Sequence, residues 1–110
     1  GLACGEPNTI SWDILRNHTT AFVSCPDWVT ARGMRTLGAP EKGDPRVISG
    51  ESGAVTTGLV ETLMLDPEYA ELKELIGLDK TSSVLCFSTE GDTDPDQYRR
   101  IVWEGEYPTC

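Results

Sequence analysis

A short apolar run that ends in a polar loop limits the fold more than any other feature of this sequence. Residues 84–87 have the length of a strand buried inside a sheet, and hydroxyls, a glycine and acids follow at once. Residues 21–24 and 46–49 form two similar runs, and segments of helical pattern separate the three. Strands that alternate with helices are typical of parallel α/β structure. We therefore predict an α/β fold with a partial parallel sheet flanked by helices.

The helical segments carry their own start and stop signals. Helices are predicted over residues 10–16, 26–37, 52–64, 67–76 and 96–102. The expected caps and stops are Asn8 or Thr9, Gly38, Gly77, and Asp94 or Asp96. Because a sheet of two or three strands is small and a parallel sheet needs both faces covered, we expect one flank of a larger protein.

Length and charge exclude several classes of function. A chain of 110 residues forms one domain at most, or part of one. The net charge of -9 argues against nucleic acid and against anionic membranes as partners, since both attract basic surfaces. The sequence has no apolar run long enough to span a membrane and no signal peptide. It also lacks an initiator methionine, so we expect it to begin inside a longer protein.

Cysteine and acidic motifs predict no metal site. The four cysteines have no CxxC spacing; Cys86 is expected to be a buried thiol, and pairing of Cys4 with Cys25 stays open. Residues 92–96 resemble the start of a calcium loop, but Gln97 stands where an EF-hand needs glycine. We therefore expect the acids near the last helix to act as caps.

Two polar loops are expected to form a ligand site. Ser88 and Glu51 each follow a predicted strand, and the ends of parallel strands meet at one edge of a sheet, where ligands bind in such folds. The segment Gly-Glu-Ser-Gly-Ala at 50–54 lacks the last glycine of a nucleophile elbow, and His18, the only histidine, is distant in sequence. A serine-hydrolase mechanism is therefore not expected. From the residues alone, an ordinary cap at the strand end is the simpler role for Ser88.

Three motifs, in order, resemble a known enzyme family. Residues 88–94 (Ser-Thr-Glu-Gly-Asp-Thr-Asp) resemble the Ser-Gly-x-Gly-Asp-x-Asp loop of the tryptophan synthase β family, whose members are fold-type-II pyridoxal phosphate (PLP) enzymes. Residues 51–54 resemble that family's Glu-Ser-Ala segment, and residues 1–3 match the Gly-Leu-Ala that opens the last third of serine and threonine dehydratases. Residues 1–8, 46–55 and 102–105 narrow the resemblance to the diaminopropionate ammonia-lyases.

The resemblance implies that residues 1–110 are the C-terminal segment of a PLP-dependent lyase, an incomplete catalytic domain. The parent would convert 2,3-diaminopropionate to pyruvate and ammonia by α,β-elimination, as a cytoplasmic homodimer. By the same resemblance Ser88 would bond the PLP ring nitrogen and Glu51 would lie near the ring's other polar edge. Thr89 and Ser49 are further candidates for ring or loop contacts.

The same resemblance places the Schiff-base lysine and the phosphate cradle before this segment. No catalytic residue is therefore expected in this chain, which would be inactive alone. Two alternatives stay open. One is a serine or threonine dehydratase, or a cysteine-metabolising lyase, of the same fold. The other is a small acidic binding module without enzymatic activity.

Overall fold

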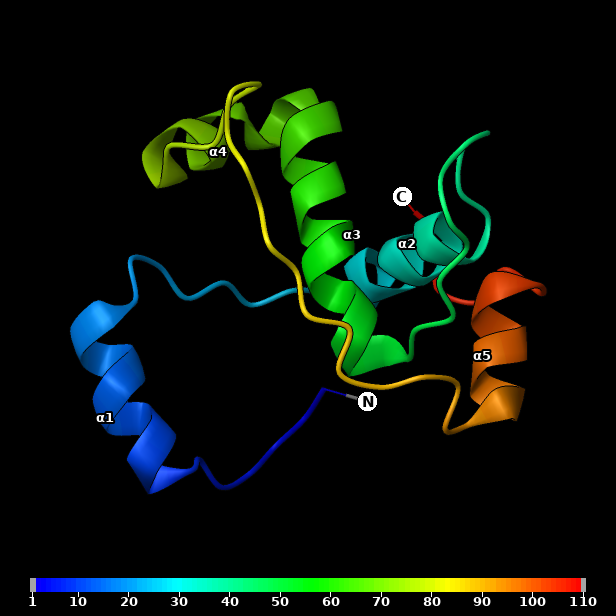
Figure 1. Ribbon diagram of the computed structural model, residues 1–110, viewed down its shortest axis with the longest axis horizontal. Coiled ribbons are helices and arrows are strands. Elements are labelled where there is room, and N and C mark those ends of the chain that lie inside the picture. The colour runs from blue at the N-terminus through cyan, green and yellow to red at the C-terminus, as the bar shows by residue number, and fades with distance from the viewer. Residues whose placement is uncertain (1, 110) are drawn as a thin grey trace.

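The structure is a computed structural model and describes residues 2–109. Within this range all the regular secondary structure is helical. Each helix predicted from the sequence is present, with ends shifted by a few residues at most. Figure 1 shows α3 running through the centre, with α2 crossing it and α5 beside α2. The elements are α1 (Thr9–His18), α2 (Asp27–Gly38), α3 (Glu51–Leu65), the 3-10 helix η1 (Pro67–Tyr69), α4 (Ala70–Ile76) and α5 (Pro95–Val102).

The ends of the helices follow local chemistry. The Asn8 side chain accepts hydrogen bonds from the amides of Ile10 and Ser11 at 3.1 and 3.0 Å, which caps α1. Gly77 ends α4 in a left-handed conformation with φ of 82°, which favours glycine. The Asp94 carboxylate accepts from the amide of Gln97 at 3.1 Å and caps α5. The caps predicted at Asn8, Gly77 and Asp94 are confirmed, whereas Gly38 is the last residue of α2 and Ala39 is its C-cap.

The centre of the fold is a close crossing of α2 and α3. A Cβ atom placed on Gly33 would lie 2.1 Å from the carbonyl oxygen of Ala54, and one on Gly58 would lie 1.9 Å from that of Val29. The two backbones therefore touch, which only glycine permits at these positions. The core continues onto α5, where Met34 packs with buried Tyr98 and Ile101.

Two arginines on α2 add polar links. Arg32, whose side chain is 17% exposed, pairs with Glu61 and Asp66 across the α2–α3 contact, with N–O distances of 3.1 and 2.8 Å. Arg35 donates from Nε to the carbonyl of Ile101 at 3.0 Å and from Nη2 to the carbonyl of Glu106. The helix that crosses α3 therefore also holds the end of α5 and the segment that follows it.

The predicted sheet is not found: residues 2–109 contain no strand. The segments expected to be strands are extended, but a strand needs a partner ladder. The one backbone hydrogen bond between the segments at 46–50 and 84–90 runs from the Gly50 amide to the Glu90 carbonyl, at 3.0 Å. Leu85 and Phe87, expected to be buried, are 78% and 70% exposed. Leu85 and Phe87 therefore have no covering layer among residues 2–109.

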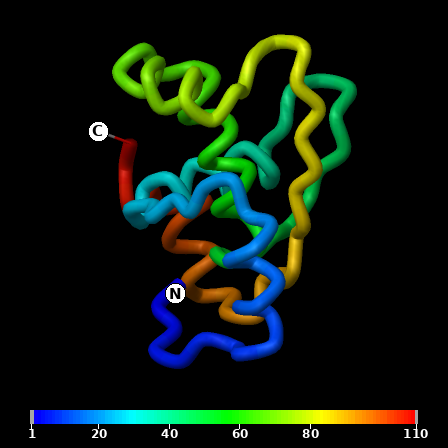
Figure 2. The backbone as a smooth tube through the Cα atoms, turned by 90° about the vertical axis from the view of Figure 1, so that its left-hand side faces the viewer, coloured from blue at the N-terminus to red at the C-terminus, as the bar shows by residue number. Residues whose placement is uncertain are grey.

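Helix α1 stands apart from the other helices, as Figure 1 shows. It contains no buried residue and contacts no other helix. Ile10 and Ile14 are exposed, and Trp12 meets Phe22 with ring centroids 6.0 Å apart. The extended segment between α4 and α5 (yellow in Figure 2), in contrast, runs along one edge of the helical body.

The structure answers the open question of whether Cys4 and Cys25 form a disulfide. Cys4 and Cys25 are both free, so no disulfide joins them. Cys86, expected to be buried, is half-buried and also free. Among the described residues no helix has the length and apolar character needed to cross a membrane.

Candidate functional site

The two loops singled out in the sequence meet at the first turn of α3. The Ser88 hydroxyl donates to the Ser49 Oγ at 2.8 Å. Ser49 is fully buried, with 0% of its surface exposed, whereas Ser88 lies at the surface. The pair therefore joins an exposed hydroxyl to a fixed interior one, although no sheet brings the two segments together.

Glycines permit this close approach. A Cβ atom on Gly53 would lie 2.4 Å from the Ser49 Oγ, 3.0 Å from the amide nitrogen of Thr89 and 3.2 Å from the Ser88 Cα. A Cβ atom on Gly50 would lie 2.6 Å from the carbonyl oxygen of Gly91. A side chain at either glycine would therefore push residues 88–91 away from α3.

Glu90 fastens the loop to the start of α3. Its Oε1 accepts from the Ser52 amide at 3.0 Å and from the Ser52 hydroxyl at 2.5 Å, and its Oε2 accepts from the Thr93 hydroxyl at 3.3 Å. The Ser52 hydrogen bonds hold the pKa of Glu90 below its ordinary value. A carboxylate is also favoured at the positive end of a helix dipole. Glu90 is therefore an anionic link between loop and helix.

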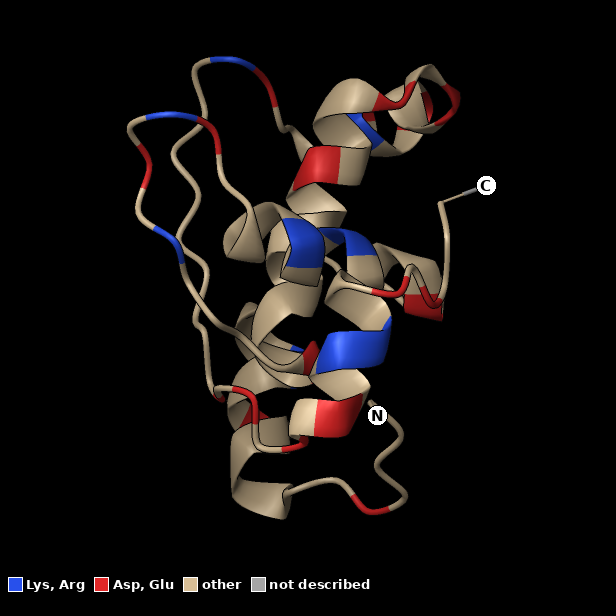
Figure 3. Ribbon diagram, turned by 90° about the vertical axis from the view of Figure 1, so that its right-hand side faces the viewer, with Lys and Arg blue, Asp and Glu red and all other residues tan. Residues whose placement is uncertain are grey.

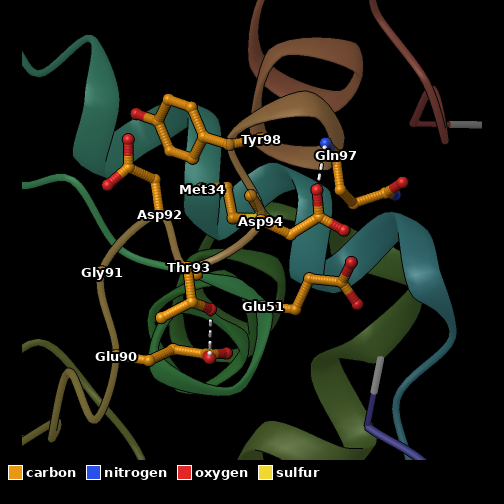
Figure 4. A pocket seen from close by; sticks show the side chains of 10 residues that line it. Met34, Glu51, Glu90, Gly91, Asp92, Thr93, Asp94, Gln97 and Tyr98 are labelled. Carbon is orange, nitrogen blue, oxygen red and sulfur yellow. Dashed lines mark hydrogen bonds between the residues drawn. The ribbon is translucent and has the colours of Figure 1, made fainter.

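A cavity of about 190 Å³ opens beside this link. Figure 4 shows the carboxylates that surround it, with Thr93 turned toward Glu90 and Asp94 toward Gln97. Acidic positions also gather in Figure 3 where this loop meets α3 and α5. The cavity is lined by Glu51, Glu90, Asp92 and Asp94 and by no lysine or arginine. Such a lining repels a phosphate group, so this cavity is not suited to the PLP phosphate.

The predicted site residues fall into two places. Ser49, Ser88 and the Thr89 backbone gather against Gly53, while Glu51 begins α3 and lines the acidic cavity.

The sequence analysis does not predict Glu90 as the anchor of the loop. No local signal marks it, because its main partner, Ser52, lies 38 residues away in the chain. Within residues 2–109 no three side chains are grouped so as to hold a metal ion.

The Ser88 hydroxyl matches one part of the PLP that the sequence resemblance implies. A pyridine nitrogen needs a single hydrogen-bonding group that reaches the ring edge. The exposed Ser88 hydroxyl, held at 2.8 Å by a buried partner, is such a group. The three lysines lie in α4 and in two loops, outside the lining of the acidic cavity, and none adjoins the serine pair in sequence. The Ser88 hydroxyl therefore suits a ring nitrogen, whereas the acidic cavity does not suit the phosphate group.

No family model matches this sequence. The diaminopropionate ammonia-lyase of Escherichia coli (strain K12) is 54% identical over 107 residues, which are 97% of this chain and 27% of that protein. A crystal structure of the E. coli enzyme in complex with D-serine superimposes on all of this chain with a TM-score of 0.92, at 53% identity and 28% of its own length. A second structure of that enzyme, with an aminoacrylate-PLP azomethine reaction intermediate, also gives 0.92 over all of this chain and 29% of its own length. The chain therefore spans about a quarter of the length of these relatives.

Proposed function

We propose that this chain is part of a diaminopropionate ammonia-lyase, to which 97% of it is similar at 54% identity, and that its parent protein is a PLP-dependent enzyme that converts 2,3-diaminopropionate to pyruvate and ammonia. Residues 1–110 form, in this proposal, a C-terminal part of the catalytic domain. The observation that carries it is the superposition on the PLP-containing relative along the whole chain, with a TM-score of 0.92. In this proposal Ser88 and its buried partner Ser49 lie beside PLP in the parent protein.

In the proposed enzyme PLP supplies the electron sink for α,β-elimination. The part played by this chain is to present Ser88 to the ring nitrogen, held by Ser49 and by the Glu90 link to α3. A neutral hydroxyl stabilises a protonated ring nitrogen less than a carboxylate does. Less negative charge then moves into the ring, which favours loss of a leaving group from the β-carbon over transamination. Thr89 and Glu51 are proposed as secondary contacts, Glu51 from the side of the acidic cavity.

Three finer points belong to the same proposal. The parent is a cytoplasmic homodimer. The extended segments at 21–24, 46–49 and 84–87 pair with strands from the rest of the parent, which supplies the covering layer that Leu85 and Phe87 lack here. The Schiff-base lysine and the phosphate cradle also come from outside this chain.

The test is pyruvate release by the full-length protein from 2,3-diaminopropionate, with L-serine and L-threonine as controls and the PLP absorbance recorded. Selective release from diaminopropionate supports both cofactor and substrate. Activity on the controls alone keeps the cofactor and favours a dehydratase. The absence of both a PLP band and activity leaves an acidic binding module.

Ser88→Asp provides a sharper test of the ring contact. The added carboxylate holds the ring nitrogen protonated, so we expect bound PLP, slower pyruvate formation and more transamination. The measurement is the ratio of pyruvate to the pyridoxamine form of the cofactor. An unchanged ratio contradicts the placement of Ser88 at the ring nitrogen.

A further inference from the structure

We infer that Ser49 is a positioning residue that turns Ser88 into a directed donor toward the PLP ring nitrogen; this inference rests on the proposed function. The Ser49 side chain is fully buried, and its Oγ lies 2.8 Å from the Ser88 Oγ. Burial leaves Ser49 no contact with a ligand, so it acts on the cofactor only through Ser88.

The proton of Ser49 has little to hold it in place. Its Oγ lies 3.4 Å from the carbonyl oxygens of Gly50 and Glu90, to which it donates. Both oxygens already accept a backbone amide at 3.0 Å, from Ala54 and Gly50 respectively. Turning the Ser49 proton toward Ser88 therefore leaves neither carbonyl without a donor.

The direction of the serine–serine hydrogen bond decides what Ser88 offers outward. In the present structure Ser88 donates inward to Ser49. When Ser49 donates instead, the Ser88 proton points outward, toward an acceptor such as an unprotonated ring nitrogen. A hydroxyl that accepts one hydrogen bond also becomes a stronger donor, because hydrogen bonds in a chain polarise one another. Ser49 thus orients and strengthens the proposed bond from Ser88 to the ring.

Gly53 sets the spacing of the pair. Its missing Cβ would lie 2.4 Å from the Ser49 Oγ and 3.2 Å from the Ser88 Cα, between the two serines and α3. Any side chain there moves the Ser49 hydroxyl from its present position. Gly53→Ala is therefore a second, independent way to break the hydrogen bond between Ser49 and Ser88, here called the relay, without removing either hydroxyl.

The experiment measures PLP binding to the full-length protein and the NMR shift of PLP labelled at its ring nitrogen. Ser49→Ala should weaken PLP binding about fivefold, the equivalent of about 1 kcal/mol for one hydrogen bond, and move the ring-nitrogen signal toward that of an unbonded pyridine. Gly53→Ala should move the signal in the same direction. Ser83→Ala, an exposed serine nearby in sequence, is the matched control and should change neither value.

A double-mutant cycle separates this role from simple packing. In the Ser88→Ala background, Ser49→Ala should have no further effect on the ring-nitrogen signal, because the relay has already lost its outer member. A Ser49 effect that persists without Ser88, or no Ser49 effect at all, overturns the inference. If Ser88→Ala itself leaves the signal unchanged, the ring contact in the proposed function fails instead.

Discussion

Replacing Gly58 by alanine tests the close crossing of α2 and α3. The new Cβ would lie 1.9 Å from the Val29 carbonyl oxygen and 2.9 Å from the Gly33 amide nitrogen. These are backbone atoms, so no side-chain rotation relieves the contact. Reaching the 3.4 Å of an ordinary contact requires the helices to separate by about 1.5 Å. Overpacking of this kind costs about 3 kcal/mol at the upper end of its usual range.

The helix propensity of alanine has the opposite effect on stability, so the sign of the measured change distinguishes the two cases. Alanine is favoured over glycine inside a helix by about 1 kcal/mol, so a helix without the crossing would gain stability. The net expectation is a loss of about 2 kcal/mol in the free energy of local opening of α2 and α3. Hydrogen exchange in the full-length protein should then be about thirtyfold faster over both helices.

Thr56→Ala is the control for this measurement, because Thr56 is exposed on the same helix. It should leave exchange unchanged or slow it slightly, since alanine is the better helix former. If Gly58→Ala also slows exchange, the two backbones do not touch and the reasoning is refuted.

Two further predictions concern polar links. Glu90→Gln should lower stability near neutral pH and have no effect in acid. The Ser52 hydrogen bonds hold the pKa of Glu90 in the folded protein below its ordinary value. The stability that they contribute is therefore present above the ordinary pKa and is lost as the pH falls through the lower pKa of the folded state. Urea unfolding of the full-length protein from about pH 7 to about pH 3 measures this, and a difference that persists at the acid end contradicts the assignment. Arg32→Met should destabilise the α2–α3 contact by about 2 kcal/mol, because it leaves the half-buried Glu61 and Asp66 without their cation. Arg32→Lys should recover part of this loss in the same assay, and equal stability of Met and Lys variants would refute an ionic role.

The helices were predictable because their signals are local. Asn8, Gly77 and Asp94 act on amides or conformations within a few residues of themselves, so sequence spacing was enough to place them. The sheet was not predictable in the same way, since a strand is completed by a partner that can lie anywhere. The apolar segment at 84–87 has the composition of a buried strand, yet its partner is absent from residues 2–109.

The candidate site was predictable in part. The sequence brought Ser88 to attention, and the resemblance to PLP enzymes added Ser49, but neither indicated that the two hydroxyls touch. That contact depends on Gly53, whose role is a missing atom and leaves no positive signal in the sequence. Glu90 was passed over because its partner Ser52 lies 38 residues away in the chain.

The glycine crossing also bears on how strongly the proposed enzyme can bind PLP near the start of α3. The middle of this helix is fixed against α2, and its first turn is fixed by Ser49 and Glu90. Ordering a mobile side chain on binding costs about 0.5 to 1.5 kcal/mol. Here that loss of conformational entropy is incurred when the protein folds rather than when the ligand arrives. Substitutions in the crossing should therefore weaken ligand affinity through a looser free state, even though they touch no ligand atom.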